Sequence, residues 1–368
     1  MLRIAIVGCG EIGSRHLQSL AQLEESASIL LIDPSSDAIA TAKSRFEDIV
    51  PKKARGLISI RECQLEESTS ILLIDPSLDS IATAKSRFEG ILPNNSRDLI
   101  SIRECQLEEV DPEIDVAIIS SSSGVRASLT SELLKYTRPK YIIFEKFLFT
   151  EESNYEAIGS LLREHNIKAW VNQWMSSTYA FMRMAKWFTR ESPISVEVSG
   201  DGWGLACNAA HFMELFDYLN GRGTLTLNSS MLDDGMLPGK RVGYFEVTGE
   251  IAIRSANKAI LEMVSHRAKS NGSYSITMQN NKRMARAILV IDKMSCDYIE
   301  GAKSFHEDYI VPRQYNITVK IIQSLMLFGE CELPGFDRSA YQHKLVLGCI
   351  DSHFREKCNW TGVGCPIT

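Results

Sequence analysis

Three glycines near the N-terminus have the spacing of a dinucleotide-binding turn. Gly8, Gly10 and Gly13 follow the apolar run IAIV and open a segment with helical periodicity. In such a turn the first glycine permits the tight bend, the second lets the backbone approach a pyrophosphate, and the third lets the helix pack close to the strand. The backbone N–H groups at the start of the helix, at Glu11 and Ile12, would then face the phosphates. A glycine-rich turn that serves only for packing is the alternative.

An aspartate follows the second apolar run at a distance suited to ribose binding. Asp33 ends SILLID and lies 25 residues after Gly8. Its carboxylate can accept hydrogen bonds from both ribose hydroxyls and would repel a 2′-phosphate. Because no arginine follows it, the sequence favours NAD over NADP. Asp75 stands in an identical context, and only one of the two aspartates can line the pocket. The other is then a helix N-terminal charge or a loop cap.

Further polar residues stand where two later apolar runs end. Ser120 and Ser121 end DVAIISS, where small hydroxyl side chains suit the surroundings of the pyrophosphate and the nicotinamide ribose. Glu145 and Lys146 follow YIIF, and the carboxyl edge of a parallel sheet is where ligands bind. We therefore expect both to contact the cofactor, and a lysine there can act in proton transfer. The plain alternatives are a serine-rich turn and a surface lysine paired with Glu145.

Alternating strands and helices must position these groups. The apolar periodicity predicts strand, helix and strand in succession, which implies a doubly wound parallel sheet of the Rossmann type. The predicted strands are 4–8, 28–33, 57–60, 115–121, 141–146 and 168–172, and the predicted helices are 12–22, 35–47, 125–136 and 151–165.

A tandem repeat interrupts this pattern. Residues 22–63 recur directly as residues 64–105, with 33 of 42 positions identical, and each copy has the pattern of a strand, a helix and a strand. A parallel crossover takes about a dozen residues or more, and only nine separate Ile60 from Ser70. We therefore expect one copy's length of chain to be extruded from the sheet or to pair with a neighbouring subunit. The expelled segment could be all of the first copy, all of the second, or a window of the same length that spans both. Chain continuity favours the first copy in the sheet.

The second half of the chain has a different pattern of predicted strands and helices. Strands at meander spacing and a few helices predict an α+β domain with an open, mostly antiparallel sheet. We expect a dinucleotide-binding domain over 1–174 and a substrate-binding and oligomerisation domain over 175–368. The predicted strands here are 194–200, 224–230, 243–255, 259–265, 273–279 and 286–293, and the predicted helices are 207–219, 313–329 and 337–355.

The composition excludes several classes of protein. The chain has 368 residues, of which 44% are hydrophobic and 23% charged, and its net charge is −6. Such a chain is globular and a poor candidate for binding nucleic acid or an anionic membrane. Its nine cysteines form no C-x-x-C pair, which indicates reduced thiols in a cytoplasmic protein, with neither a disulfide framework nor a metal site. The apolar runs are too short for a membrane span or a signal peptide.

Three segments together resemble the Gfo/Idh/MocA oxidoreductases, the glucose–fructose oxidoreductase and inositol dehydrogenase family. They are IAIVGCGEIGSRH, the triplet Glu145-Lys146-Phe147, and GWGLACNAAHFMELF at 202–216. With the element order they cover nearly the whole chain once one repeat is set aside. The resemblance implies a Rossmann domain followed by an open-faced sheet, through which members commonly pair, so we expect a dimer or tetramer. It also implies hydride transfer between NAD and a secondary hydroxyl or ketone of a sugar or nucleotide-linked sugar.

The same resemblance assigns two catalytic residues. Lys146 matches the lysine that approaches the reactive hydroxyl and the nicotinamide, and Phe147 stands where a proline, often associated with a cis turn, is usual. His211 matches the family's histidine, and neutral imidazole suits accepting the hydroxyl proton. Cys207 stands where the family has an acid, and Glu214 replaces an aspartate.

Substrate contacts are also expected from the resemblance. Trp203 and Asn208 belong to a variant associated with bacterial surface-sugar pathways, and Trp174 ends a strand where it could stack on a sugar ring. Arg126 stands where many members have a histidine and could hold an anionic group. Packing in the core is the alternative for both tryptophans, and a surface charge at a helix start is the alternative for Arg126.

Two other functions fit the same sequence. The missing acid at Cys207 and the duplicated half of the cofactor domain suit a protein that binds a cofactor without turnover. The second alternative function is that of an assembly module, in which the extra strand–helix–strand segment mediates oligomerisation.

Overall fold

The structure, a computed structural model, divides into two compact units. Unit 1 comprises Met1–Glu145, Glu156–Asn172 and Arg313–Cys331, and unit 2 comprises Lys146–Tyr155, Gln173–Pro312 and Glu332–Thr368. Within these ranges the structure describes residues 2–8, 11–20, 27–32, 41, 45, 58–59, 71–74, 102–104, 113–188, 192–240, 243–267, 274–290, 293–312 and 314–368.

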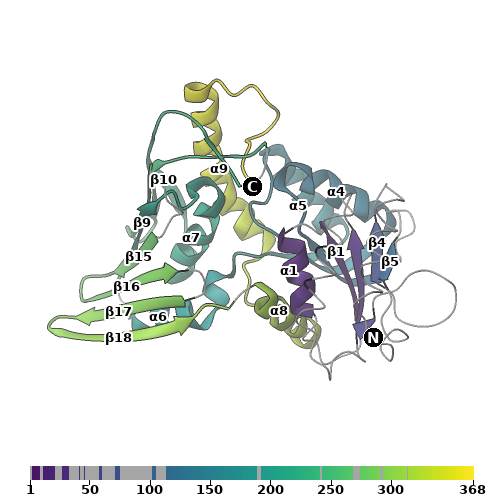
Figure 1. The fold of residues 1–368 in the computed structure, drawn as a ribbon, viewed down its shortest axis with the longest axis horizontal. Coiled ribbons are helices and arrows are strands. Elements are labelled where there is room, and N and C mark those ends of the chain that lie inside the picture. Colours follow the sequence, from purple (N-terminus) through teal and green to yellow (C-terminus); the bar gives the residue numbers. More distant parts are fainter. Residues whose placement is uncertain are drawn as a thin grey trace. The chain divides into compact units, whose positions relative to one another are not determined.

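Unit 1 is built on a parallel sheet, which confirms the predicted fold class (Figure 1). The strand order is β5-β4-β2-β1-β6-β7-β8, with β3 also paired to β2, and every pairing among these described strands is parallel. Residues 4–7 of β1 are buried without alternation, as expected when helices cover both faces of a parallel sheet. The strands are β1 (Leu2–Val7), β2 (Ala27–Ile32), β3 (Ile58–Ser59), β4 (Ile71–Ile74), β5 (Ile102–Glu104), β6 (Glu113–Ile119), β7 (Arg138–Phe144) and β8 (Lys168–Val171).

The two copies of the repeat share one edge of β2. The short β3, from the first copy, pairs with the start of β2, and β4, from the second copy, pairs with its last residues, Leu31 and Ile32. β5, also from the second copy, then pairs with β4. The described strands of both copies therefore lie within one sheet, because β3 pairs with only two residues of β2 and leaves the rest of that edge to β4. Most of the residues on which the expected extrusion of one copy's length depends lie outside the described residues.

The described helices of unit 1 include one from far along the chain. α8 packs on α1, where Ser19 Oγ accepts the N–H of Val319 at 2.7 Å and His16 Nδ1 lies 2.7 Å from Thr318 Oγ1. A helix predicted in the C-terminal half of the sequence therefore packs on the first helix of the dinucleotide-type unit. The helices are α1 (Glu11–Leu20), α4 (Ser123–Tyr136), α5 (Ser153–Glu164) and α8 (Gln314–Phe328).

Unit 2 is built on an eight-stranded, mostly antiparallel sheet, as predicted. Its order is β10-β13-β14-β9-β15-β16-β17-β18, and only the β14–β9 pairing is parallel. A separate two-stranded sheet joins β11 to β12. The strands are β9 (Ser195–Asp201), β10 (Leu225–Leu232), β11 (Leu237–Pro238), β12 (Phe245–Glu246), β13 (Gly249–Ser255), β14 (Ile260–His266), β15 (Tyr274–Gln279), β16 (Arg283–Val290), β17 (Lys293–Glu300) and β18 (Lys303–Ile310).

One predicted strand of unit 2 is broken into two. The segment 243–255 forms β12, which pairs with β11, and β13, which pairs with β10. Gly249 begins β13 with φ +107°, and a Cβ there would lie 2.4 Å from the carbonyl oxygen of Met231. Glycine is therefore required at this position, where β12 gives way to β13.

Four helical segments complete the part of unit 2 that the structure describes. α7 packs against β9 and β14, and α9 packs against α7. The segments are the 3₁₀ helix η2 (Trp174–Ser177) and the helices α6 (Tyr179–Trp187), α7 (Leu205–Leu219) and α9 (Phe336–Cys358).

Candidate active site

The glycine turn of unit 1 is shaped as the sequence predicts. Gly8 has φ +92°, and a Cβ there would lie 2.1 Å from the backbone nitrogen of Ser121. A Cβ at Gly13 would lie 1.8 Å from the carbonyl oxygen of Gly8. Both positions therefore require glycine, one for the turn and one for the close approach of helix to strand. α1 begins at Glu11 and continues through Ile12, whereas Gly10 lies outside the described residues.

The two candidate serines lie beside this turn. Ser120 Oγ donates to the carbonyl oxygens of Val7, at 3.1 Å, and Gly8. The backbone N–H of Ser121 donates to Val7 at 2.9 Å, but its buried hydroxyl oxygen has no hydrogen-bond partner among the described residues. A buried hydroxyl without a partner, next to a turn that admits only glycine, fits a bound phosphate or ribose. Both candidate ribose ligands, Asp33 and Asp75, lie outside the described residues.

Glu145 is buried in unit 1 beneath the strand ends. Its Oε1 lies 2.7 Å from His16 Nε2 and accepts a hydrogen bond from Asn172. Burial alone would raise the pKa of Glu145, but these bonds and the charges of His16 and Arg126 outweigh it, so the pKa lies below its ordinary value. Glu145 thus ties α1 to the ends of β7 and β8. His16 was not singled out by the sequence, although it lies on α1 three residues after Gly13.

Arg126 also lies inside unit 1. Its side chain is 1% exposed, and Nη2 donates to the carbonyl oxygen of Ser121. The alternative of an exposed charge at a helix start is therefore wrong, because α4 buries this guanidinium beside the strand ends. Contact with an anionic substrate group stays a prediction.

Lys146 belongs to unit 2 and contacts the first turn of α7. Its Nζ donates to the carbonyl oxygen of Cys207 at 3.1 Å and lies 3.0 Å from Cys207 Sγ. The peptide bond between Lys146 and Phe147 is cis. The Phe147 ring is buried edge-on against His343 at 4.6 Å between ring centroids. The structure therefore brings together Lys146 and the residue that replaces the family's acid.

His211 lies on the same helix, one turn further along. Its side chain is 7% exposed, and Nδ1 has no hydrogen-bond partner among the described residues. Burial, together with the charges of Lys146 and His343, lowers the pKa of His211 well below its ordinary value. The imidazole is therefore neutral at neutral pH and has a lone pair for a proton. Trp174 packs near it, with 5.7 Å between ring centroids.

The residues before α7 are fixed by packing. Trp203 is 5% exposed, its indole N–H donates to Val264 at 2.8 Å, and its ring meets Phe212 and Tyr274 edge-on or tilted. Packing, the alternative to a sugar contact, is the role that the structure shows for Trp203. Asn208 Nδ2 donates to the carbonyl oxygen of Trp203 at 2.8 Å and so fixes the turn that leads into α7.

A carboxylate that the sequence did not indicate lies at the same turn. Glu246 Oε2 accepts the N–H of Ala206 at 2.9 Å, and Oε1 accepts the N–H of Cys207 at 3.2 Å. Burial raises the pKa of Glu246 to about 7, although the two N–H groups and Lys146 partly offset this effect. The only signal in the sequence is an acid within a predicted apolar strand, and nothing local connects it to α7.

The described residues hold no group of histidine, cysteine and carboxylate side chains suited to a metal ion. The six cysteines that the structure describes are free thiols. No helix in the described part of the chain is long and apolar enough to cross a membrane.

Comparisons with known proteins bear on the fold. No protein-family model matches this sequence, and no curated protein matches it. Among solved structures, KijD10, a 3-ketoreductase from Actinomadura kijaniata solved with NADP, is similar with a TM-score of 0.62 and 13% identity, over 95% of this chain and 96% of that one.

Two further structures are similar along their whole length. The UDP-N-acetylglucosamine 3-dehydrogenase GnnA from Acidithiobacillus ferrooxidans has a TM-score of 0.63 and 8% identity, over 94% of this chain and 96% of that one. The dehydrogenase MviM from Clostridium difficile has a TM-score of 0.59 and 12% identity, over 95% and 99%. This chain therefore has the two-part fold of these proteins, a parallel Rossmann-type sheet and a mostly antiparallel one.

Proposed function

We propose that this protein is a nicotinamide-dependent oxidoreductase that acts on a secondary hydroxyl, or the matching ketone, of a sugar or nucleotide-linked sugar. The observation that carries the proposal is a pair of groups at the start of α7: Lys146, which follows β7 and is held against Cys207, and the neutral His211, which lies on α7 one turn after Cys207. A cationic donor held against a helix and a neutral base on that helix suit the movement of a hydroxyl proton during hydride transfer.

The residues of unit 1 fit a nicotinamide dinucleotide. Gly8 and Gly13 allow the tight turn and the close approach of α1 to it, the first N–H groups of α1 follow directly, and the hydroxyl of Ser121 is available to a ligand. When bound, the dinucleotide supplies the hydride acceptor or donor. The protein then contributes binding, orientation and the proton.

Lys146 and His211 have different roles in moving the hydroxyl proton. The Lys146 ammonium donates a hydrogen bond to the reacting oxygen and stabilises the negative charge that develops on it. The buried imidazole of His211 takes the hydroxyl proton on oxidation and returns it on reduction. The opposite assignment, with Lys146 as the primary base, is the alternative, and the two single variants separate the two assignments.

The observations that bear on the choice between NAD and NADP point in opposite directions. The sequence favours NAD through Asp33 or Asp75, whereas similar solved structures were solved with NADP. Calorimetric titration with NADH and NADPH in parallel measures the preference directly. Binding of either supports the cofactor site, and Gly13→Val should abolish it, because its Cβ would overlap the Gly8 carbonyl. Gly348→Ala is the matched control, because nothing lies within 4 Å of its Cβ.

The substrate class is proposed from the similar folds. GnnA is a nucleotide-sugar dehydrogenase, and KijD10 was solved with TDP-benzene. The test is a panel of nucleotide sugars and free sugars, with the absorbance of the reduced nicotinamide as readout. Turnover of one member that depends on Lys146 supports the proposal, and cofactor binding without turnover on any of them contradicts it.

A catalytically impaired binding protein is the second candidate. The thiol at Cys207, in the place of an acid that the Gfo/Idh/MocA resemblance leads one to expect, favours it. The cluster of Lys146 with His211 on α7 argues for turnover instead.

A further inference from the structure

The first turn of α7 has no acidic side chain of its own, but a carboxylate from another element lies against it. Glu246, at the end of β12, accepts the backbone N–H groups of Ala206 at 2.9 Å and Cys207 at 3.2 Å. These N–H groups have no acceptor within the helix, and the positive end of the helix dipole favours a negative charge here.

Cys207 links this carboxylate to the lysine of the candidate active site. Lys146 Nζ donates to the Cys207 carbonyl oxygen at 3.1 Å and lies 3.0 Å from its sulfur, while Glu246 accepts the N–H of the same residue. The positive charge of Lys146 also favours the charged form of Glu246 and so partly offsets the rise in the pKa of this carboxyl caused by burial.

The position of Glu246 is built by the surrounding fold. β12 pairs with β11, the N–H of Phe245 donates to Pro366 at 2.8 Å, and the Phe245 ring meets Trp360. Gly204, with φ +80°, leaves room for the carboxylate, because a Cβ there would lie 3.1 Å from Glu246 Oε1. Separate contacts therefore place this side chain at the start of α7.

We propose that Glu246 is a positioning residue for Lys146: from β12 it supplies the negative charge that the first turn of α7 lacks at Cys207, and so holds the lysine ammonium against that turn. A carboxylate at position 207 would serve the same purpose, because Cys207 Sγ already lies 3.0 Å from Lys146 Nζ. The catalytic consequence rests on the proposed function, whereas the coupling between Glu246 and Lys146 does not.

The protonation of Glu246 makes this positioning depend on pH. Because burial raises the pKa of Glu246 to about 7, its charge appears as the pH rises through neutrality. Among the described residues, the titratable groups that face it are Lys146, on the segment after β7, and Cys207, on α7. The paired strand β11 is Leu237–Pro238 and carries no charge.

A titration that needs no activity tests the coupling. In protein labelled with ¹³C at the glutamate carboxyls, two of the glutamates that the structure describes, Glu246 and Glu214, should titrate near neutral pH, because burial raises both pKa values to about 7. Glu214→Gln assigns them by elimination. Lys146→Met should raise the midpoint of Glu246 and leave that of Glu214 in place. An unchanged Glu246 midpoint would overturn the proposal.

Kinetics test the consequence for the reaction. Glu246→Gln should lower kcat by about tenfold or more and remove the inflection near neutral pH from the pH profile of kcat. Adding Cys207→Asp to that variant should restore much of the loss, which a merely structural role would not allow. Glu262→Gln, at an exposed position on β14, is the control. Wild-type kcat and an unchanged profile in Glu246→Gln contradict the proposal, whereas absent turnover in the wild type contradicts the proposed function alone.

Discussion

At the scale of single residues, Lys146 is distinguished by what its ammonium touches. It donates to the Cys207 carbonyl and lies beside the Cys207 thiol, so a weakly polar sulfur stands where an acid would form a salt bridge. His211 contributes a neutral ring, because burial keeps its pKa low. The ammonium thus contacts a neutral carbonyl and a thiol, with which a substrate oxygen would compete, while Glu246 accepts the N–H of the same cysteine.

Lys146→Met removes this charge while keeping the length of the side chain. We expect kcat to fall by about 10²–10⁴-fold, the usual contribution of a proton-transfer group, with cofactor affinity nearly unchanged, because the glycine turn belongs to unit 1. Steady-state kinetics and calorimetry on the same preparation measure both. Lys168→Met, at an exposed ion pair with Glu330, is the control. An equal loss of cofactor binding would give Lys146 a structural role.

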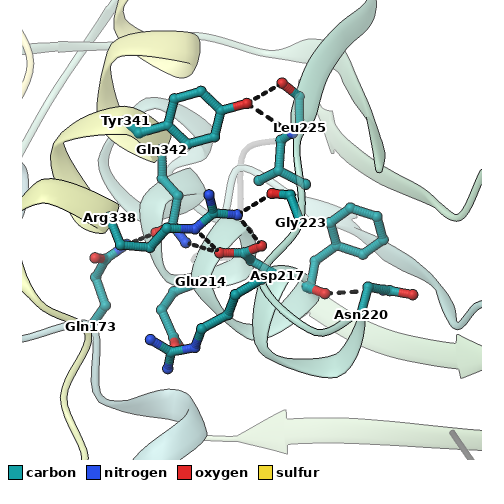
Figure 2. Close-up of polar contacts among 11 residues, drawn as sticks. Gln173, Glu214, Asp217, Asn220, Gly223, Leu225, Arg338, Tyr341 and Gln342 are labelled. Atoms are coloured by element: carbon teal, nitrogen blue, oxygen red, sulfur yellow. Dashed lines mark hydrogen bonds and ion pairs between the residues drawn. The ribbon is translucent and has the colours of Figure 1, made fainter. Parts of the chain in front are cut away.

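At the scale of elements, α7 is fixed to its neighbours by buried charges (Figure 2). Asp217 on α7 accepts from the Arg338 guanidinium and from Gln342 Nε2 at 2.7 Å, both on α9. Glu214 accepts from Ser176 at 2.8 Å and lies 3.3 Å from Arg222. Because His211 lies on α7 and Lys146 is held against it, these contacts fix the position of the helix on which the candidate site depends.

The ion pair between α7 and α9 should be costly to break from one side. Arg338→Met leaves the buried Asp217 carboxylate without its cation, and we expect a loss of about 3–5 kcal/mol in the free energy of unfolding. Denaturant titration of the variant measures this. Asp217→Asn in the same chain should recover part of the loss, and Arg355→Met, at an exposed pair with Asp351, should change little. Equal effects of the two arginine substitutions would contradict this role.

Glu214 should make stability depend on pH. Burial raises its pKa from 4.5 to about 7, so between these values the folded protein binds more protons than the unfolded chain. The contribution of this group is therefore complete below about pH 4.5 and is lost as the pH rises to about 7, with a magnitude on the order of 3 kcal/mol. Urea unfolding measures the difference in unfolding free energy between Glu214→Gln and the wild type. We expect this difference to favour the variant more at about pH 8 than at about pH 5, because only the wild type loses the contribution of a protonated Glu214. Parallel pH dependences of the two proteins would show that Glu214 is not protonated in this way.

At the scale of the whole molecule, the repeat places strands of both copies in one sheet. β3 and β4 divide one edge of β2, and β5 extends the sheet beyond β4. The sheet therefore accepts the duplicated strands without displacing β1, which bears the glycine turn.

Deleting residues 64–105 should leave a folded protein that binds the same cofactor, because the first copy retains its own strand–helix–strand pattern and Asp33. Circular dichroism and calorimetric titration check both properties. In the full chain, Asp33→Ala should weaken cofactor binding and Asp75→Ala should not. The reverse result would assign the ribose pocket to the second copy.

The sequence predicted those parts of the fold that rest on local patterns. The spacing of Gly8 and Gly13 alone predicts their turn, and the apolar runs of β1, β6 and β7 predict buried parallel strands. β17 and β18 both escaped prediction. None of the residues of β18 is buried, so no alternation of buried and exposed residues marks it, whereas β17 was missed although Met294, Cys296 and Tyr298 alternate as its buried residues. Glu246 and His16 escaped for another reason: their partners lie 39 and 129 residues away, at Cys207 and Glu145, and no local pattern encodes such contacts.

The most direct test of the central claim follows the hydride itself. The protein is incubated with oxidised nicotinamide cofactor and nucleotide sugars that carry deuterium on the carbon to be oxidised, and the reduced cofactor is analysed by mass spectrometry. We predict that deuterium appears at nicotinamide C4 with the wild type and is greatly reduced with Lys146→Met. Cofactor that binds but acquires no deuterium from any sugar of the panel would contradict the account.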